Sequence, residues 1–270
     1  MIPLSFSAVC AMLGYHTGSR MVLARGNGVQ DTTFAVIKRT KLFAKQVETL
    51  RFSCDCHIYN PLDYAWPMHE AYLSAYASKP VKTLLVGMNP GPFGMAQTGV
   101  PFGEIGAVKT FLKLSQPIGK PPTEHPARPI LGLETKRSEV SGKRLWGLME
   151  EHYETAEAFS QEMAIYNYCP LVFMQRTKTA KNLTPDKLAK GERLALQTIC
   201  DAYLGDIITL LDPAFLIGVG VYAHQMLEKV NRGDERRIVS SILHPSPGNP
   251  QANKGWDEKA AAVFRDLGIW

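Results

Sequence analysis

The amide side chain of Asn89 stands in a rigid loop that directly follows an apolar segment of this chain. Residues 84–86 are typical of a buried strand of a parallel sheet, and Asn89 comes three residues later, before a proline. That position is confined to extended backbone, so the Asn89 amide should project past the carboxyl end of the strand, where open α/β sheets bind ligands. Glycines 91, 94, 99 and 103 and the rings of Phe93 and Phe102 would complete a pocket for a planar, polar molecule.

A second strand candidate, near the other end of the chain, ends on an imidazole. Residues 237–243 (RIVSSIL) are apolar enough for a buried strand, and His244 again precedes a proline. We therefore expect Asn89 and His244 on one rim of one sheet, where both can hydrogen-bond the same polar ligand. The loop at 245–253 has three prolines and one glycine and should be stiff and protruding, and Asn253 is a suitable N-cap for a final helix.

These two segments together closely resemble a known family. Residues 87–104 (GMNPGPFGMAQTGVPFGE) and 244–256 (HPSPGNPQANKGW) are similar to the single-strand-selective monofunctional uracil-DNA glycosylases, within the uracil-DNA glycosylase superfamily. Further resemblance lies at residues 59–61, 64–66, 128–142, 167–173 and 182–185, so it covers roughly residues 58–268. Residues 1–50 carry no such resemblance.

The resemblance implies a DNA-repair enzyme that hydrolyses the N-glycosidic bond of uracil in single- and double-stranded DNA and leaves an abasic site. Asn89 would hold the attacking water, and His244 would donate a hydrogen bond to uracil O2. Asn167 would recognise the Watson–Crick edge of the base, because cytosine presents the reverse pattern of donors and acceptors. Phe102 would stack on the flipped base. A better-known branch of the superfamily has aspartate in this loop, so Asn89 implies a more modest rate.

Other residues would contact the base or the DNA. Met88, Gly91 and Met95 would bind the base, and the last two would line its C5 side through their backbone, which implies activity on 5-hydroxymethyluracil. The residues expected at the DNA backbone or in the wedge are Ser141, Ser246, Pro247, Gly248, Asn249, Gln251 and Lys254. Vertebrate relatives have arginine where this chain has Gly248. We therefore expect weaker engagement of duplex DNA, or that Asn249 or Gln251 takes over the role.

The residues alone leave alternatives open. Asn89 could be a turn residue, His244 a loop histidine, Asn167 a capping side chain and Phe102 part of the core. At the level of function, the alternatives are a protein that binds damaged bases without cleavage and a hydrolase of free nucleosides or nucleotides. Intact Asn89 and His244 argue against the first, and the protruding loop argues against the second. The 87–104 loop has no lysine that could form a Schiff base, which favours a monofunctional enzyme.

Composition sets broad limits. The 270 residues carry a net charge of +5, which weakly favours an anionic partner such as DNA, and 45% of them are hydrophobic. No run of 18 apolar residues exists, so no membrane span or membrane partner is expected. The apolar stretch at residues 2–13 lacks a basic region before it, so a secretory signal is not expected, and Met21 is an alternative start. We expect a monomer.

The chain has five cysteines, an odd number without regular spacing, which favours a reducing compartment. We therefore expect the protein in the cytoplasm, associated with the nucleoid, if it is bacterial, or in the nucleus if it is eukaryotic. Residues 54–57 (CDCH) raise the possibility of a metal site. The remaining cysteines lie in apolar surroundings, so reduced thiols are the preferred interpretation. We expect neither a metal nor a cofactor. Residues 218–223 (GVGVYA) match a dinucleotide-binding pattern, but the acid it requires is missing, which favours tight strand–helix packing.

Strands and helices alternate along the chain. Strands are expected at 82–87, 162–168, 215–219 and 237–243, and helices at 34–52, 59–76, 104–111, 141–153, 184–211, 222–231 and 253–267. Ser141 and Thr184 would cap two of these helices. This order predicts an α/β fold, a three-layer α/β/α domain with a central four-stranded parallel sheet flanked by helices. Residues 51–270 would form the glycosylase-like domain. Residues 1–50 would be an N-terminal extension with a helix, packed on or preceding the domain. That helix is expected to be amphipathic, with a basic face that is solvated or lies along DNA.

Overall fold

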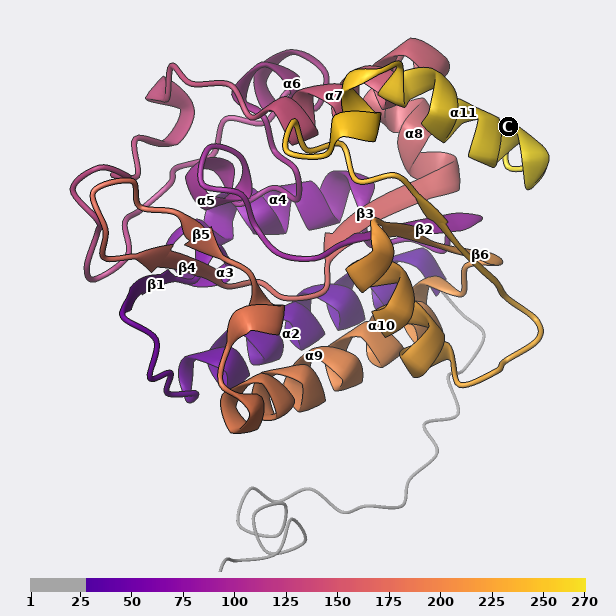
Figure 1. Ribbon diagram of the computed structural model, residues 1–270. Coiled ribbons are helices and arrows are strands. Elements are labelled where there is room, and N and C mark those ends of the chain that lie inside the picture. Colours follow the sequence, from indigo (N-terminus) through magenta and orange to yellow (C-terminus); the bar gives the residue numbers. More distant parts are fainter. Residues whose placement is uncertain (1–27) are drawn as a thin grey trace, which may run out of the picture.

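The centre of the fold is a four-stranded parallel sheet. The computed structural model describes residues 28–270, and its strands run in the order β3-β2-β6-β7 (Figure 1). Their bounds are Thr83–Gly87 for β2, Met163–Asn167 for β3, Phe215–Val219 for β6 and Ile238–Ile242 for β7. Every residue of β2 and β3 is buried, as expected for parallel strands with both faces covered. The predicted four-stranded parallel sheet is confirmed.

Helices cover both faces of this sheet. One layer contains α2 (Gly28–Glu48), α9 (Lys190–Leu211) and α10 (Val221–Asn231), and α9 contacts both of the others. The other layer contains α7 (Val140–Tyr153), α8 (Ala156–Glu162) and α11 (Trp256–Asp266), in which α7 contacts the other two (Figure 1). The three-layer arrangement is therefore as predicted.

A second, three-stranded antiparallel sheet is absent from the sequence prediction. It consists of β1 (Cys56–Tyr59), β4 (Val172–Gln175) and β5 (Asn182–Leu183), in the order β1-β4-β5. These strands have two to four residues, too few for a clear hydrophobic period. Tyr59, predicted to begin a helix, instead ends β1. Asn60 then caps α3 (Pro61–Tyr64) by accepting from the Leu62 amide, and α4 (Trp66–Tyr76) follows.

Several predicted helix starts are wrong. Ser141 does not cap α7: it is a buried residue of the helix, and Glu139 occupies the N-cap position. Thr184 caps only a short 3-10 helix, Pro185–Lys187, because Leu188 and Ala189 are extended and delay α9 until Lys190. Asn253 ends a 3-10 helix, Pro250–Asn253, and α11 starts after Gly255. The helix expected at 34–52 is α2. The remaining short elements are α5 (Met95–Thr98), α6 (Ile105–Thr110) and a 3-10 helix at Gly132–Glu134.

Helix α9 is long and apolar enough to meet a length-and-composition test for a membrane span. Seven residues of α9 are buried in the core and the helix packs along α2, which explains much of its apolar character. Val36, Phe43, Ala44 and Val47 of α2 belong to the same buried cluster as the sheet. The division of the chain at residue 50 stays a prediction. The apolar stretch at residues 2–13, Cys10 and Met21 lie outside the described residues.

The cysteines within residues 28–270 are free thiols: Cys54, Cys56, Cys169 and Cys200. Among these described residues, no group of three or more His, Cys, Asp or Glu side chains has an arrangement that could hold a metal ion. The dinucleotide-like segment is explained by packing. A Cβ on Gly218 would lie 2.3 Å from the backbone nitrogen of His224, so the glycine lets β6 approach α10 closely.

Candidate functional site

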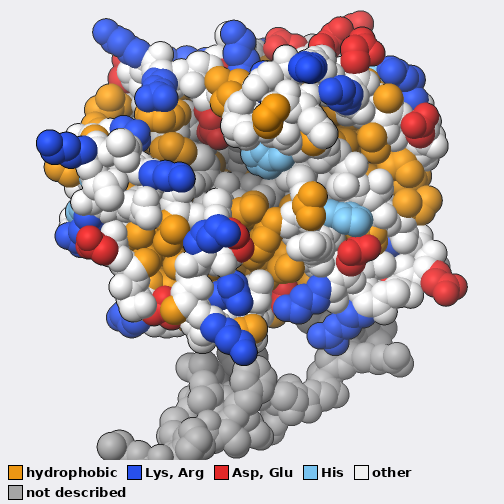
Figure 2. All heavy atoms as spheres, viewed as in Figure 1, with side chains coloured by type: hydrophobic (Ala, Val, Ile, Leu, Met, Phe, Trp, Pro, Cys, Tyr) orange, Lys and Arg blue, Asp and Glu red, His pale blue; other side chains and the backbone are white. Residues whose placement is uncertain are grey.

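The carboxyl ends of β2, β3 and β7 meet at a cavity of about 350 Å³. In the view of Figure 2 the molecule is hollowed at its centre, and Lys and Arg side chains lie around the hollow. The segments that follow these three strands supply most of the lining of the cavity, and α7 and the segment at 182–184 supply the rest. The lining residues are Met88, Asn89, Pro90, Gly91, Phe102, Glu139, Ser141, Asn167, Asn182, Thr184, His244 and Ser246.

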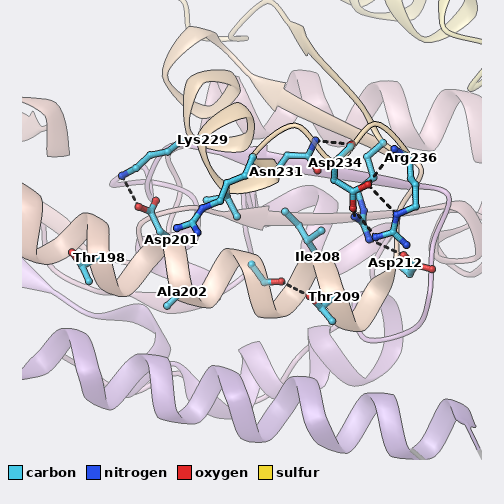
Figure 3. Close-up of a pocket in the computed structure, with 14 residues that line it drawn as sticks. Thr198, Asp201, Ala202, Ile208, Thr209, Asp212, Lys229, Asn231, Asp234 and Arg236 are labelled. Carbon is cyan, nitrogen blue, oxygen red and sulfur yellow. Dashed lines mark hydrogen bonds and ion pairs between the residues drawn. The ribbon is translucent and has the colours of Figure 1, made fainter. Parts of the chain in front are cut away.

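A larger hollow, of about 830 Å³, lies beside the amino ends of β6 and β7, between α9 and α10 (Figure 3). Ion pairs of 2.5–2.8 Å neutralise many of its charged side chains: Lys229 with Asp201, Arg236 with Asp234, and Arg237 with Asp212. Ligands of open α/β sheets bind at the carboxyl edge instead. We therefore place the candidate site in the smaller cavity.

Asn89 is fixed with its carbonyl oxygen unused. Its Nδ2 donates to the backbone oxygen of Leu171 at 3.2 Å, so Oδ1 is the end of the amide left to bind a ligand or water. The loop itself is held by Asn182, whose Nδ2 donates to the backbone oxygen of Pro90 at 3.0 Å. Asn182 Oδ1 accepts from the amide of Phe173 at 3.2 Å. The small antiparallel sheet thus anchors the loop that carries Asn89.

His244 is neutral and its tautomer is defined by a local hydrogen bond. The backbone amide of Ser246 donates to His244 Nδ1 at 3.1 Å, so Nδ1 is the acceptor and the proton resides on Nε2. Burial lowers the pKa of the imidazole, which keeps it uncharged at neutral pH. The strand end before it is fixed by Trp256, whose Nε1 donates to the backbone oxygen of Leu243 at 2.6 Å. His244 can therefore offer an Nε2–H donor to a ligand.

Asn167 and Phe102 form the inner end of the cavity. Asn167 is 8% exposed, its Nδ2 donates to the sulfur of Met95 at 3.2 Å, and its buried Oδ1 has no hydrogen-bond partner. Phe102 has a φ of 53°, and its ring centroid lies 6.5 Å from that of His244. Gly87 makes room for both side chains, because a Cβ there would lie 2.4 Å from Asn167 Oδ1 and 2.6 Å from the Phe102 ring. This unpaired oxygen can accept a hydrogen bond from a ligand.

The remaining predicted residues lie in the cavity lining, behind it, or in the loop beyond it. Met88, Gly91, Ser141 and Ser246 line the cavity together with Asn89, Phe102, Asn167 and His244. Met95 is not among the lining residues and instead supports Asn167. Pro247, Gly248, Asn249, Gln251 and Lys254 lie in the loop beyond the cavity. Phe93, expected to offer a flat face to the ligand, stacks instead against the guanidinium groups of Arg137 and Arg128.

The loop at 245–253 has a defined shape. Asn249 Oδ1 accepts from the Gln251 amide, and Asn253 Nδ2 donates to the backbone oxygen of Pro247 at 2.9 Å. Arg144 of α7 donates to the backbone oxygen of Pro245 at 2.8 Å and to Asn253 Oδ1 at 3.0 Å. These bonds tie the loop to α7, while its tip, which includes Pro247 and Gly248, is exposed.

Four residues that build this site are not marked as functional by the sequence. Asn182 and Thr184 belong only to a resembling segment, and Arg144 has no local signal. Glu139 lines the cavity, and its buried Oε2 has no hydrogen-bond partner. Burial, reinforced by the nearby charge of Glu104, raises the pKa of the Glu139 carboxyl to about 7. Glu139 belongs to the resembling segment at 128–142, but a carboxyl before a helix is ordinary in sequence, so nothing local marks it as functional.

Fold and site together define an α/β protein with a small, amide-lined cavity at the carboxyl edge of a parallel sheet. Residues 74–268 match the uracil DNA glycosylase superfamily, so this chain belongs to that superfamily.

Curated relatives and a solved structure are similar over most of the chain. The single-strand selective monofunctional uracil DNA glycosylase of Mus musculus is 44% identical over 213 residues, which are 78% of this chain and 76% of the relative. The Bos taurus protein of the same name is 43% identical, with 78% of each chain covered. The crystal structure of Pedobacter heparinus SMUG2 shares the fold with a TM-score of 0.61, at 20% identity, and covers 87% of this chain and 99% of its own.

Proposed function

We propose that this protein is a monofunctional uracil-DNA glycosylase of base-excision repair, which uses water to cleave the N-glycosidic bond and leaves an abasic site. Membership of the superfamily and 44% identity to a relative named for this activity support the proposal. The observation that carries it is the set of unused polar atoms around the cavity. Asn167 Oδ1 has no partner, Asn89 Oδ1 is free because Nδ2 is bonded to the Leu171 oxygen, and His244 is held with its proton on Nε2.

This set suits a flipped uracil. The Asn167 oxygen accepts from N3–H and its amide group donates to O4, whereas cytosine would leave buried groups unpaired. The Phe102 ring stacks on the base. As the bond breaks, its electron pair moves onto the base, and His244 Nε2–H stabilises the negative charge at O2.

Asn89 positions the water. Its unused Oδ1 accepts a hydrogen bond from the water that adds to C1′ of the oxocarbenium-like sugar. An amide is a weak base, but a dissociative reaction requires mainly orientation of the nucleophile. The geometry at Asn89 supports this role, because the bond to Leu171 prevents the amide from turning its nitrogen toward the cavity.

We further propose that the enzyme accepts uracils with a polar C5 substituent, such as 5-hydroxymethyluracil. Gly91 and Met95 would form that side of the pocket, and Met88 would also bind the base. Of these, Gly91 and Met88 line the cavity, while Met95 would act through Asn167.

DNA is the partner that this superfamily acts on. Ser141, Ser246 and Lys254 would contact phosphates, and Pro247, Gly248, Asn249 and Gln251 would enter the duplex as a wedge. The hydrogen bonds from Arg144 support a preformed wedge loop. The protein would act as a monomer on single- or double-stranded DNA, in the cytoplasm of a bacterium or the nucleus of a eukaryote.

A gel assay tests the proposal. Labelled oligonucleotides with one uracil, single- or double-stranded, are incubated with the parent, Asn89→Ala or His244→Ala in EDTA and then treated with or without alkali. Strand breaks that appear only after alkali and are lost in both variants are expected. A retarded band without strand breaks would contradict glycosylase activity and favour a protein that only binds damaged bases.

A further inference from the structure

The carboxyl group of Glu139 fills the space that two glycines leave in the wall of the cavity. A Cβ on Gly91 would lie 2.2 Å from Glu139 Oε1, and a Cβ on Gly94 would lie 1.6 Å from Oε2. At both positions the three nearest atoms all belong to Glu139. The loop between these glycines therefore packs directly against one carboxyl group, which projects from the start of α7.

The surroundings of this carboxyl favour its uncharged form. Oε2 is buried without a hydrogen-bond partner, a costly position for a carboxylate. Glu104 is the charged group that acts on it, and His244 lines the same cavity. The Arg137 guanidinium stacks on Phe93 between the two glycines, and Lys143, one turn along α7, has an exposed side chain. Burial and, to a lesser degree, Glu104 raise the pKa to about 7. In the proposed mechanism this carboxyl contacts neither the base nor the water.

We propose that Glu139 is a positioning residue, which in its uncharged form fixes the Gly91–Gly94 backbone at the wall of the base pocket. This inference rests on the proposed glycosylase function. Gly91 follows Asn89 by two residues on the same loop, so the wall and the water-binding amide move together. An ionised carboxylate would leave its buried position for water, and the loop would lose its support. Small displacements near reacting groups lower rates strongly.

A pH profile separates this role from simple packing. For the parent, kcat/KM on single-stranded uracil DNA should fall at least about fivefold between about pH 6.5 and about pH 8.5 as Glu139 ionises. Glu139→Gln keeps the shape without the ionisation, so its activity at about pH 6.5 should stay near that of the parent and change less than about twofold over the same range. Glu150→Gln, an exposed residue of the same helix, is the matched control and should follow the parent.

A second measurement tests the close packing of Gly91 against the Glu139 carboxyl. Gly91→Ala should lower the kcat/KM of the parent about tenfold, because its methyl group displaces the Glu139 carboxyl. In a Glu139→Ala background the same substitution should lower kcat/KM only slightly further, because the carboxyl is already absent. Parallel pH profiles of parent and Glu139→Gln, or additive effects in this cycle, would overturn the inference while leaving the glycosylase intact. If the parent cleaves no uracil at any pH, the proposed function itself fails.

Discussion

Glu139 should make the folded protein less stable as the pH rises, because its carboxyl is harder to ionise in the folded chain than in the unfolded one. Burial and Glu104 raise its pKa from 4.5 to about 7. The folded state therefore holds a proton that the unfolded state has released, and stability declines as the pH rises from about 4.5 through 7. At about 1.4 kcal/mol per pH unit, the upper limit of the loss is about 3.5 kcal/mol. Partial exposure of the side chain reduces this, and we expect roughly half.

Urea unfolding of the parent and Glu139→Gln at about pH 5 and about pH 8 measures this loss directly. Glutamine has the same shape and does not titrate, so the other ionisable groups cancel when the two proteins are compared. The parent should lose about 1.5 kcal/mol more than Glu139→Gln between the two pH values, with unchanged m-values. Equal losses in the two proteins would refute the argument that Glu139 is buried in its uncharged form.

Three further substitutions test the site and the wedge loop. Asn167→Asp should lower uracil excision at least about 100-fold, because a carboxylate cannot donate to O4, and a cleavage assay on uracil and cytosine oligonucleotides measures the change in preference. Arg144→Ala removes the two hydrogen bonds that hold the loop at 245–253, so kcat/KM should fall roughly tenfold on duplex DNA and less on single strands. Lys143→Ala is the control. An equal loss on both substrates would count against a wedge. Gly248→Arg adds a side chain at the exposed tip and should strengthen duplex binding in a titration; no gain in binding or turnover would show that this position does not limit duplex engagement.

Much of the fold follows from local patterns. The four strands of the parallel sheet are predictable because short apolar runs bounded by turn residues favour buried strands. The three-stranded antiparallel sheet is not, since β5 has only two residues and its pairing with β4 depends on chain contacts that no local period records. The helix starts predicted at Ser141, Thr184 and Asn253 are also wrong. Each residue is a good N-cap by type, but the backbone conformation around it, set by tertiary packing, decides where the helix begins.

The sequence by itself determined the parallel sheet and which two side chains follow β2 and β7. Asn89 and His244 each precede a proline after an apolar strand, and parallel strands bring such positions to one edge. The sequence predicts a buried strand before His244, but β7 is an edge strand of which only Ile242 is buried, because no further strand covers it. Only the tertiary structure decided the tautomer of His244 and the orientation of the Asn89 amide. The proton of His244 is assigned by the Ser246 amide, and the orientation of Asn89 by the Leu171 oxygen. Glu139 became visible only in three dimensions, because burial and the packing of two distant glycines, rather than residue type, set the charge of its carboxyl group.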